Sequence, residues 1–402
     1  MGLAGDRIGR RTVFILLAIT ISLATGIMVF TPGPDGFVPG WLFLVFFRIF
    51  VGVGNAGIYT IDLPLVQEFI PGYKRGWVSA LVTTMLPAGG MLAGFAAWLL
   101  LPLVGWRGLF LVGLVPLVLV FMIRYWVPES PRWLIRMGRL EEARKSLAWA
   151  LKIDPEQITL PARVEAAEHT RWLELFKYPR LVLSGCLTGL TQTGGASLGL
   201  WGATLLVLVM KVTPAHAAYL MIWVSVSAVL GRFFITALIE PLGRRGSGTL
   251  CLVLGGIFMI VQGYWYDAYI GTWSVFYLAL IASSFFASAN YSVVGPYMAE
   301  IWPARLRASG MGLSYGTGNL GKFIGPLGLS LIMGAGDVIK PAAPNLAMLG
   351  PAFLYFASWS VVGLIGFWVF GPEPKGLTFD EIDRELDGLP ATARPVVQAA
   401  GN

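Results

Sequence analysis

The chain has few of the residue types on which most soluble enzymes and small secreted proteins depend. Of its 402 residues only two are cysteines and two are histidines, and 13% are charged, whereas about 25% of a soluble globular chain is charged. Cys186 and Cys251 both lie in apolar runs, with no other Cys or His at ligand spacing. This pattern excludes a disulfide framework, and no metal site is expected.

Apolar residues, by contrast, are abundant. The chain is 56% hydrophobic and its mean hydropathy is +0.71. A helix needs about 20 apolar residues to cross the hydrocarbon core of a bilayer, and such runs occur ten times. They lie near residues 12–31, 41–67, 77–101, 106–127, 181–209, 214–239, 247–270, 273–299, 309–333 and 348–371. We therefore predict an all-α membrane protein with ten transmembrane helices in a lipid bilayer.

The distribution of basic residues indicates how these helices are oriented. If the first loop is cytoplasmic and the sides alternate, most of the 29 lysines and arginines fall in cytoplasmic segments, and only Arg107, Lys211 and Lys340 fall on the opposite side. Because cytoplasmic loops carry an excess of Lys and Arg, both ends of this chain are predicted to be cytoplasmic, in a cell inner (plasma) membrane. The net charge of +7 is spread over separate loops, so nucleic acid is not an expected partner.

One long hydrophilic stretch divides the chain into two halves. We predict an N-terminal half with four spans over residues 1–127, a cytoplasmic linker over 128–180, a C-terminal half with six spans over 181–371, and a cytoplasmic tail over 372–402. The linker has helical spacing and charges of both signs, which is typical of a solvated helix.

A short basic element occurs once in each half. Gly2-Leu-Ala-Gly-Asp6-Arg7-Ile-Gly9-Arg10-Arg11 opens the chain, and Glu240-Pro-Leu-Gly243-Arg244-Arg245 repeats it. Further pairs recur in register: Tyr59/Tyr291, Pro64/Pro296, Glu68/Glu300, Pro71/Pro303 and Arg75/Arg307. Two halves that carry the same motifs in the same order are typical of a duplicated membrane transporter. Since the second copy lies between two spans, we expect the chain to be a fragment that lacks a preceding apolar hairpin; a ten-helix protein is the alternative.

Several motifs follow one another in a fixed order. They are the opening basic loop, Arg48-x3-Gly52, Glu68-x2-Pro71-x3-Arg75, Gly105-Trp106-Arg107, Pro128-Glu129-Ser130-Pro131-Arg132, Glu300-x2-Pro303-x3-Arg307 and Pro372-Glu373-Pro374-Lys375-Gly376. In this order they resemble the major facilitator superfamily, particularly its sugar-porter and metabolite:proton-symporter-like branches. The resemblance implies a two-half helical bundle that works as a monomeric transporter, with this chain supplying the third to twelfth of twelve helices. Thr191-Gln192-Thr193 departs from the paired glutamines of sugar carriers, which puts a hexose substrate in doubt.

The charges of the basic loops predict a gate on the cytoplasmic side. Carboxylates are stabilised at helix N-termini, and guanidinium groups form bidentate pairs with carboxylates. The predicted gate residues are Asp6, Arg7, Arg10, Arg11, Glu68, Arg75, Glu240, Arg244, Arg245, Glu300 and Arg307. The alternative is that these charges only anchor the topology. An Asp6→Asn variant with unchanged transport would favour the alternative.

Polar residues inside the spans predict a substrate pathway, because placing them in lipid is costly. The predicted cavity residues are Asn55, Gln192, Asn290, Tyr291, Asn319 and Lys322. For each amide, an interhelical hydrogen bond is the alternative role. Lys322 differs, because an ammonium near the midplane requires a counter-charge or an anionic ligand. Asp62 is a candidate proton carrier, or else a partner of a loop arginine.

A glycine pattern within the second span, Gly52-Val-Gly54-Asn-Ala-Gly57, matches the dinucleotide-binding fingerprint. That fingerprint must follow a strand and open a helix, whereas this one lies in the middle of an apolar run. Close packing of helices explains it better, and no cofactor is expected.

Together these features predict a secondary active transporter, not an enzyme, that moves a small polar or anionic metabolite by alternating access. Three cations lie inside the spans, Arg48, Arg232 and Lys322, against one clear acid, which favours an organic or aromatic acid as substrate. No GxxxxGK[ST] loop is present, so a proton gradient is the expected driving force. The alternatives are a sugar facilitator or symporter, a non-transporting membrane sensor, and an inactive fragment.

Overall fold

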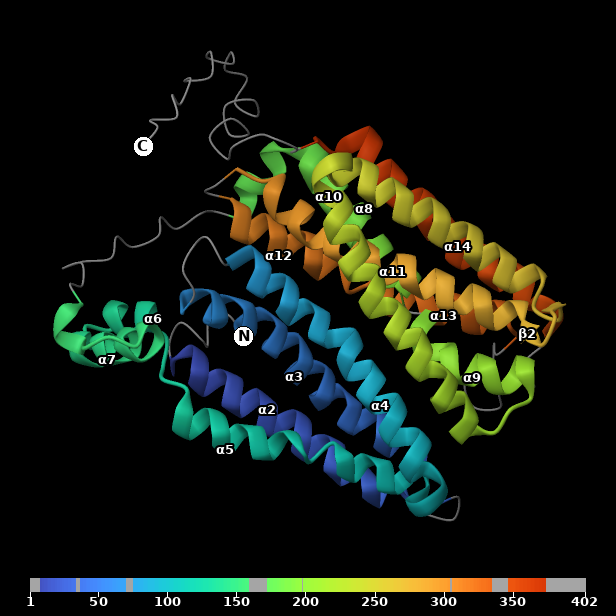
Figure 1. Ribbon diagram of the computed structural model, residues 1–402, viewed down its shortest axis with the longest axis horizontal. Helices are drawn as coiled ribbons and strands as arrows, with labels where there is room; N and C mark the ends of the chain where they lie inside the picture. The colour runs from blue at the N-terminus through green and yellow to red at the C-terminus, as the bar shows by residue number, and fades with distance from the viewer. Residues whose placement is uncertain are drawn as a thin grey trace. The chain divides into compact units, whose positions relative to one another are not determined.

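The computed structural model describes residues 8–33, 37–69, 75–158, 172–196, 198–303, 306–334 and 346–373. The chain folds into two compact units, Met1–Ala167 and Glu168–Asn402. Each unit is a bundle of helices (Figure 1). The predicted tail over 372–402 lies almost entirely outside the described residues, and the predicted division at residues 127 and 180 stays a prediction.

The first unit is built around its first long helix. Its elements are α2 (Arg10–Ile27), η1 (Met28–Phe30), α3 (Gly40–Glu68), α4 (Arg75–Val112), α5 (Pro116–Trp126), α6 (Pro131–Arg136), α7 (Leu140–Leu151) and η3 (Pro155–Gln157). Helix α2 lies between α3 and α5 (Figure 1). It buries Val13 and Leu17 at 3% and 5% exposure. The glycine pattern that matches the dinucleotide fingerprint lies inside α3, where Gly54 lets α3 approach Ile21 of α2 closely.

The second unit contains more helices and one small hairpin. Its elements are η4 (Trp172–Lys177), α8 (Pro179–Ala196), α9 (Leu198–Met210), α10 (Pro214–Tyr264), β1 (Tyr269–Ile270), β2 (Trp273–Ser274), α11 (Val275–Glu300), α12 (Arg307–Gly318), α13 (Gly321–Ile332), η5 (Leu346–Met348), α14 (Leu349–Ile365) and the π-helical η6 (Gly366–Phe370). Helix α10 packs along α11 and α14, and α8 packs against α11, α12, α13 and α14.

Two glycines break the longest helices. Gly105 in α4 has φ 66° and ψ 179°, and Gly243 in α10 has φ 75° and ψ 174°, a backbone region that only glycine adopts readily. The 51 residues of α10 would span about 77 Å as one helix, more than twice the hydrocarbon thickness. Gly243 therefore separates two spans, at the place where the sequence predicts a loop.

Seven helical stretches in the described part of the chain are long and apolar enough to cross a membrane. Two of them, Thr84–Trp126 and Pro214–Tyr264, contain the glycine breaks. The α12 and α13 segments, at 12 residues each, are too short to qualify singly. The predicted total of ten spans stays a prediction.

The hairpin between α10 and α11 was not predicted. Strands β1 and β2 pair antiparallel, Tyr269 with Ser274 and Ile270 with Trp273, and the turn uses Gly271 at φ 62°. The predicted span over 247–270 is thus too long, because α10 ends at Tyr264. Aromatic residues extend the apolar run past the end of the helix, yet those on the hairpin are exposed.

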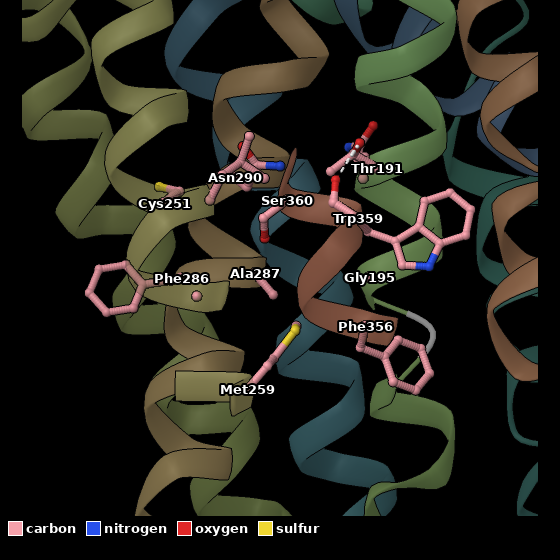
Figure 2. A pocket seen from close by; sticks show the side chains of 13 residues that line it. Thr191, Gly195, Cys251, Met259, Phe286, Ala287, Asn290, Phe356, Trp359 and Ser360 are labelled. Atoms are coloured by element: carbon pink, nitrogen blue, oxygen red, sulfur yellow. Dashed lines mark hydrogen bonds between the residues drawn. The ribbon is translucent and has the colours of Figure 1, made fainter. Parts of the chain in front are cut away.

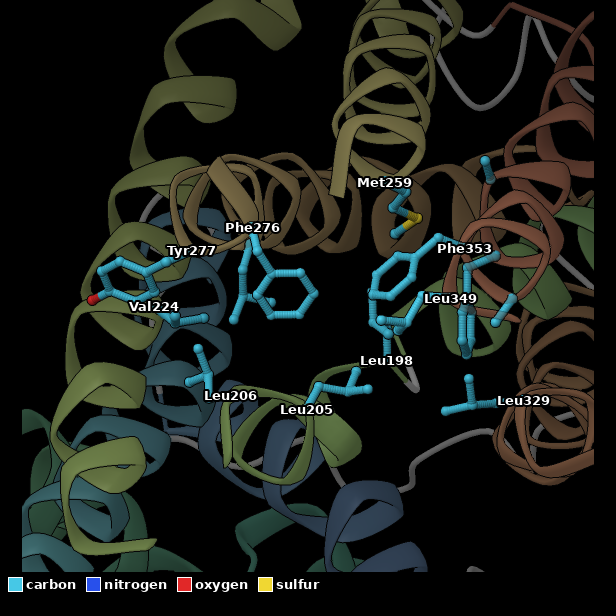
Figure 3. Packing of buried hydrophobic residues seen from close by; sticks show 14 of the residues in the cluster. Leu198, Leu205, Leu206, Val224, Met259, Phe276, Tyr277, Leu329, Leu349 and Phe353 are labelled. Carbon is cyan, nitrogen blue, oxygen red and sulfur yellow. The ribbon is translucent and has the colours of Figure 1, made fainter. Parts of the chain in front are cut away.

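Large apolar side chains form the core of the second unit. One cluster joins α9, α10, α11 and α14, with Phe276, Phe353, Leu205 and Leu206 almost fully buried (Figure 3). A second cluster surrounds Trp302 and includes Tyr297, Phe367 and Leu175. The two clusters pack α8, α10, α11 and α14 against one another, and these helices carry the polar residues of the candidate site.

Candidate functional site

The basic loop of the second unit forms an ion-pair network. At the Gly243 break, the Nε of Arg244 donates to Oε2 of Glu300 at 2.9 Å, and Nη2 donates to Oε1 at 3.1 Å. The Nη1 group lies 3.5 Å from Oε1 of Glu240. The Arg244 side chain is 16% exposed and that of Glu300 21%, whereas that of Glu240 is 77% exposed. The bidentate pair between Arg244 and Glu300, which joins α10 to α11, is therefore the stronger contact.

A second carboxylate, from Glu373, caps the helix that starts after this glycine. Glu373 follows η6 and accepts hydrogen bonds from the backbone N–H groups of Arg244 at 3.1 Å and Arg245 at 2.8 Å. These N–H groups begin a helical segment, where a negative charge is favoured. A Cβ atom on Gly243 would lie 3.0 Å from Oε2 of Glu373. Glycine is thus required here both for its backbone angles and for the approach of the carboxylate.

The first unit repeats this arrangement at the start of α2. Gly9 has φ 99°, and Glu129 accepts from the backbone N–H of Arg11 at 2.8 Å and of Thr12 at 3.4 Å. The Arg11 side chain also donates to the carbonyl of Val127 at 2.9 Å. In both units, therefore, a carboxylate three residues after the end of an apolar helical segment caps the helix that starts after a glycine with positive φ.

Sequence reasoning missed Glu129 and Glu373 as members of the charge network. Both belong to Pro-Glu motifs, Pro128-Glu129 and Pro372-Glu373, and each motif directly follows an apolar run. This shared position in the two halves could have indicated that both glutamates have the same role. Among the predicted gate residues, Asp6 and Arg7 and the side chains of Glu68, Arg75 and Arg307 lie outside the described residues, as does that of Asp62.

The remaining predicted gate residues take different places. Arg10 is the first residue of α2. The guanidinium carbon of Arg245 lies 5.5 Å from the centroid of the Trp368 ring, whose indole N–H donates to Thr249 at 2.8 Å. Arg245 therefore packs against Trp368 of η6, whereas Arg244 forms the ion pair between α10 and α11.

Two of the predicted cavity residues line the same small cavity inside the second unit. Gln192 of α8 and Asn290 of α11 are 5% and 4% exposed, and both line a cavity of about 30 Å³. Thr191 and Ser360 line it as well, and Figure 2 shows Asn290 and Ser360 beside the same space. The Oε1 atom of Gln192 and the Oδ1 atom of Asn290 have no hydrogen-bond partner in the part of the chain that the structure describes.

The other predicted cavity residues contact neighbouring polar and aromatic groups or are exposed. The guanidinium carbon of Arg232 lies 5.5 Å from the centroid of the Tyr291 ring. The Nε of Arg232 also donates a hydrogen bond to the Ser288 hydroxyl at 3.0 Å. Asn319 donates to the Tyr315 carbonyl of its own helix at 3.1 Å. Two residues are exposed on their own units, Lys322 on the second and Asn55 on the first. The Nζ atom of Lys322 lies 5.9 Å from the Tyr315 ring centroid.

The described residues hold no set of side chains that could bind a metal ion. Within the described ranges, no group of three or more His, Cys, Asp or Glu side chains is placed to hold a metal ion. The arrangement instead offers helix caps from distant segments, an interhelical ion pair and polar groups embedded in apolar bundles.

Comparison with known proteins identifies the family. The sequence profile described as "Sugar (and other) transporter" matches residues 1–386. The chain belongs to this transporter family. It is therefore a multi-pass membrane transporter rather than an enzyme, and proteins of this family bind small-molecule substrates within the membrane.

Solved structures show the same fold. Over 96% of this chain and 84% of the other, it matches the inward-open xylose transporter XylE from E. coli, with a TM-score of 0.70 and 20% identity. A second structure of that protein, described as a major facilitator superfamily proton:xylose symporter, has a TM-score of 0.69 at 21% identity and covers 96% of this chain and 85% of that one. The transporter thus has the helical fold of the major facilitator superfamily.

Among curated relatives, the transporter is 28% identical over 343 residues to the niacin transporter NiaP of Acinetobacter baylyi, covering 84% of this chain and 75% of that protein. It is 28% identical over 366 residues to solute carrier family 22 member 7 of Mus musculus, covering 88% of this chain and 63% of that protein. The inner membrane metabolite transport protein YdjE of E. coli is 26% identical over 349 residues, covering 83% of this chain and 74% of that protein.

Proposed function

We propose that this transporter carries a small organic anion, with an aromatic carboxylic acid as the favoured class, and that a proton gradient drives it through alternating access. We further propose that it lies in a cell inner (plasma) membrane with both ends of this chain cytoplasmic. The distribution of Lys and Arg between loops supports that orientation.

One observation carries the choice of an anion: the position of Lys322 in an apolar helical segment. Its ammonium is exposed on the second unit and lies 5.9 Å from the face of Tyr315. An ionisable residue inside a membrane span usually marks a substrate or ion pathway, and a cation beside an aromatic ring can bind an anionic aromatic ligand through charge and stacking. Asn319, Tyr291 and Asn55 are the further residues that we propose as substrate contacts.

One of the relatives supports the same class of substrate. The similar protein NiaP is a niacin transporter, and niacin is an aromatic carboxylic acid. The sugar specificity of the xylose transporter is not transferred, because that similarity rests on 20% identity and the paired glutamines of sugar carriers are replaced here by Thr191-Gln192-Thr193.

The ion pairs at the two basic loops are proposed to gate the pathway. The ion pair between Arg244 and Glu300 holds the Gly243 break of α10 to the C-terminal end of α11, and its release would free these two segments to separate. In the first unit we propose Asp6, Arg7, Glu68 and Arg75 for the same task. Asp62 is the proposed proton carrier.

Counterflow into proteoliposomes tests the proposal directly. Vesicles loaded with niacin, benzoate, a hexose, a pentose or an organic cation are offered the same labelled compound outside. We expect exchange of the aromatic acids, collapse of uphill uptake by a protonophore, and loss of both with Lys322→Ala. Lys145→Ala, at an exposed position on α7, is the matched control. Exchange of a sugar with an unaffected Lys322→Ala variant would overturn the anion proposal, and saturable binding without flux would indicate a sensor.

A further inference from the structure

The cavity between α8, α10, α11 and α14 differs from a substrate pocket in size and in lining. Its volume is about 30 Å³, whereas pockets for metabolites usually exceed roughly 300 Å³. On this measure of volume, about 10–15 Å³ is enough to hold one water molecule. The cavity therefore has room for one or two solvent molecules, but not for a transported compound.

The polar atoms of the cavity require a partner. The Oε1 atom of Gln192 and the Oδ1 atom of Asn290 are buried without a hydrogen-bond partner in the described part of the chain, on side chains that are 5% and 4% exposed. Buried amide groups in native proteins are almost always paired with protein or with ordered water. Two such groups around one small cavity are the usual setting for an internal water.

We infer that this cavity binds an internal water molecule, held between the amide groups of Gln192 on α8 and Asn290 on α11. The water donates its two hydrogens to the two amide oxygens, and the hydroxyl group of Ser360, which also lines the cavity, is available as a donor to its oxygen. Because water both donates and accepts, the assignment holds whichever way each amide is turned.

A metal cation fits the cavity less well. Hard cations require several oxygen ligands and usually carboxylates, and none of the side chains that line the cavity is charged. Water needs no compensating charge. Gln192 and Asn290 are thereby assigned to a hydration site that links two helices, and the substrate contacts are left to the residues around Lys322.

Hydroxyl-radical footprinting with X-rays tests this assignment, because radicals formed from an internal water oxidise the side chains next to it. Met259 lines the cavity (Figure 2) and is 5% exposed, while Met298 and Met333, which do not line it, are 1% and 7% exposed. The two controls thus bracket the burial of Met259. We expect sulfoxide at Met259 to form several-fold faster than at either control in the purified full chain.

The variant Gln192→Leu/Asn290→Leu tests the two ligands. Replacing both amides by apolar groups leaves no unpaired partner, so we expect a thermal transition within a few degrees of the unmodified chain. Oxidation of Met259 should fall to the level of the controls. If Met259 is oxidised no faster than Met298 and Met333 in the unmodified chain, the water site is wrong, whether or not the double variant folds. If its oxidation persists in a folded double variant, the two amides do not hold the water. Neither outcome depends on which substrate is transported.

Discussion

Arg244 and Glu300 form a two-point ion pair that joins α10 to α11, with the guanidinium nitrogens 2.9 and 3.1 Å from the two carboxylate oxygens. Both side chains are largely shielded from solvent, at 16% and 21% exposure. Glu240 contacts the same guanidinium at 3.5 Å but is 77% exposed. The two carboxylates therefore provide a matched comparison within one network.

Glu300→Gln should destabilise the transporter more than Glu240→Gln. Loss of a shielded hydrogen bond to a charged group costs about 1.5–3 kcal/mol, whereas an exposed pair contributes about 0–1 kcal/mol. Chemical unfolding in detergent micelles measures both values. If the ion pair also gates transport, Glu300→Gln will change the uptake rate and Glu240→Gln will not. Equal effects of the two substitutions on stability would contradict the ranking.

Gly243→Ala should be more harmful than Gly105→Ala, although the backbone angles at the two positions are nearly the same. The unfavourable φ costs about 1–3 kcal/mol at either position. A Cβ atom at position 243 would also press on the Glu373 carboxylate at 3.0 Å, whereas nothing lies within 4 Å of one at position 105.

The difference between Gly243→Ala and Gly105→Ala measures the contribution of the helix cap. Displacing the Glu373 carboxylate should increase the loss of unfolding free energy of Gly243→Ala by up to about 2 kcal/mol relative to Gly105→Ala. Combining Gly243→Ala with Glu373→Gln should give less than the sum of the two losses, because both remove the same contact. Additive losses would show that the glycine and the carboxylate act independently.

Gly54→Ala and Gly52→Ala should change stability in opposite directions. A Cβ atom on Gly54 would overlap Cγ1 of Ile21, while one on Gly52 would have no atom within 4 Å. Overpacking at position 54 should cost about 1–3 kcal/mol, and alanine at position 52 should gain roughly 0.8–1 kcal/mol in helix propensity. Thermal unfolding of the two variants checks this, and a gain at both positions would argue against close packing of α2 and α3.

Tyr291→Leu should destabilise the transporter more than Tyr291→Phe does. The Arg232 guanidinium lies over the Tyr291 ring at 5.5 Å, and Arg232 is 5% exposed. A buried cation over an aromatic face is worth about 1–2 kcal/mol, and phenylalanine keeps that face. Unfolding curves and the uptake rate of the favoured acid would both report the change. Equal behaviour of leucine and phenylalanine at this position would rule out a contribution from the aromatic face.

Much of the second unit was predictable from local patterns. The break between the spans over 214–239 and 247–270 was expected from the basic loop, and the structure places Gly243 with φ 75° at that point. Arg244 and Glu300 are both among the predicted gate residues, and the structure shows that they form an ion pair; their role as a gate stays a prediction. The hairpin over 269–274 was not expected, because hydropathy does not distinguish aromatic residues on an exposed hairpin from those on a span.

Composition and apolar run length by themselves determined that this protein is helical and spans a membrane, because the length of an apolar helix follows from the thickness of a bilayer. The repeated basic loops and the order of the motifs, not the composition, predicted a transporter. Only the tertiary structure decided which carboxylate reaches which helix end. Glu129 and Glu373 accept hydrogen bonds from backbone N–H groups that lie 118 and 129 residues away along the chain, and no local sequence pattern predicts a contact over such a separation. The same holds for Gln192 and Asn290, whose shared cavity exists only because α8 and α11 pack together.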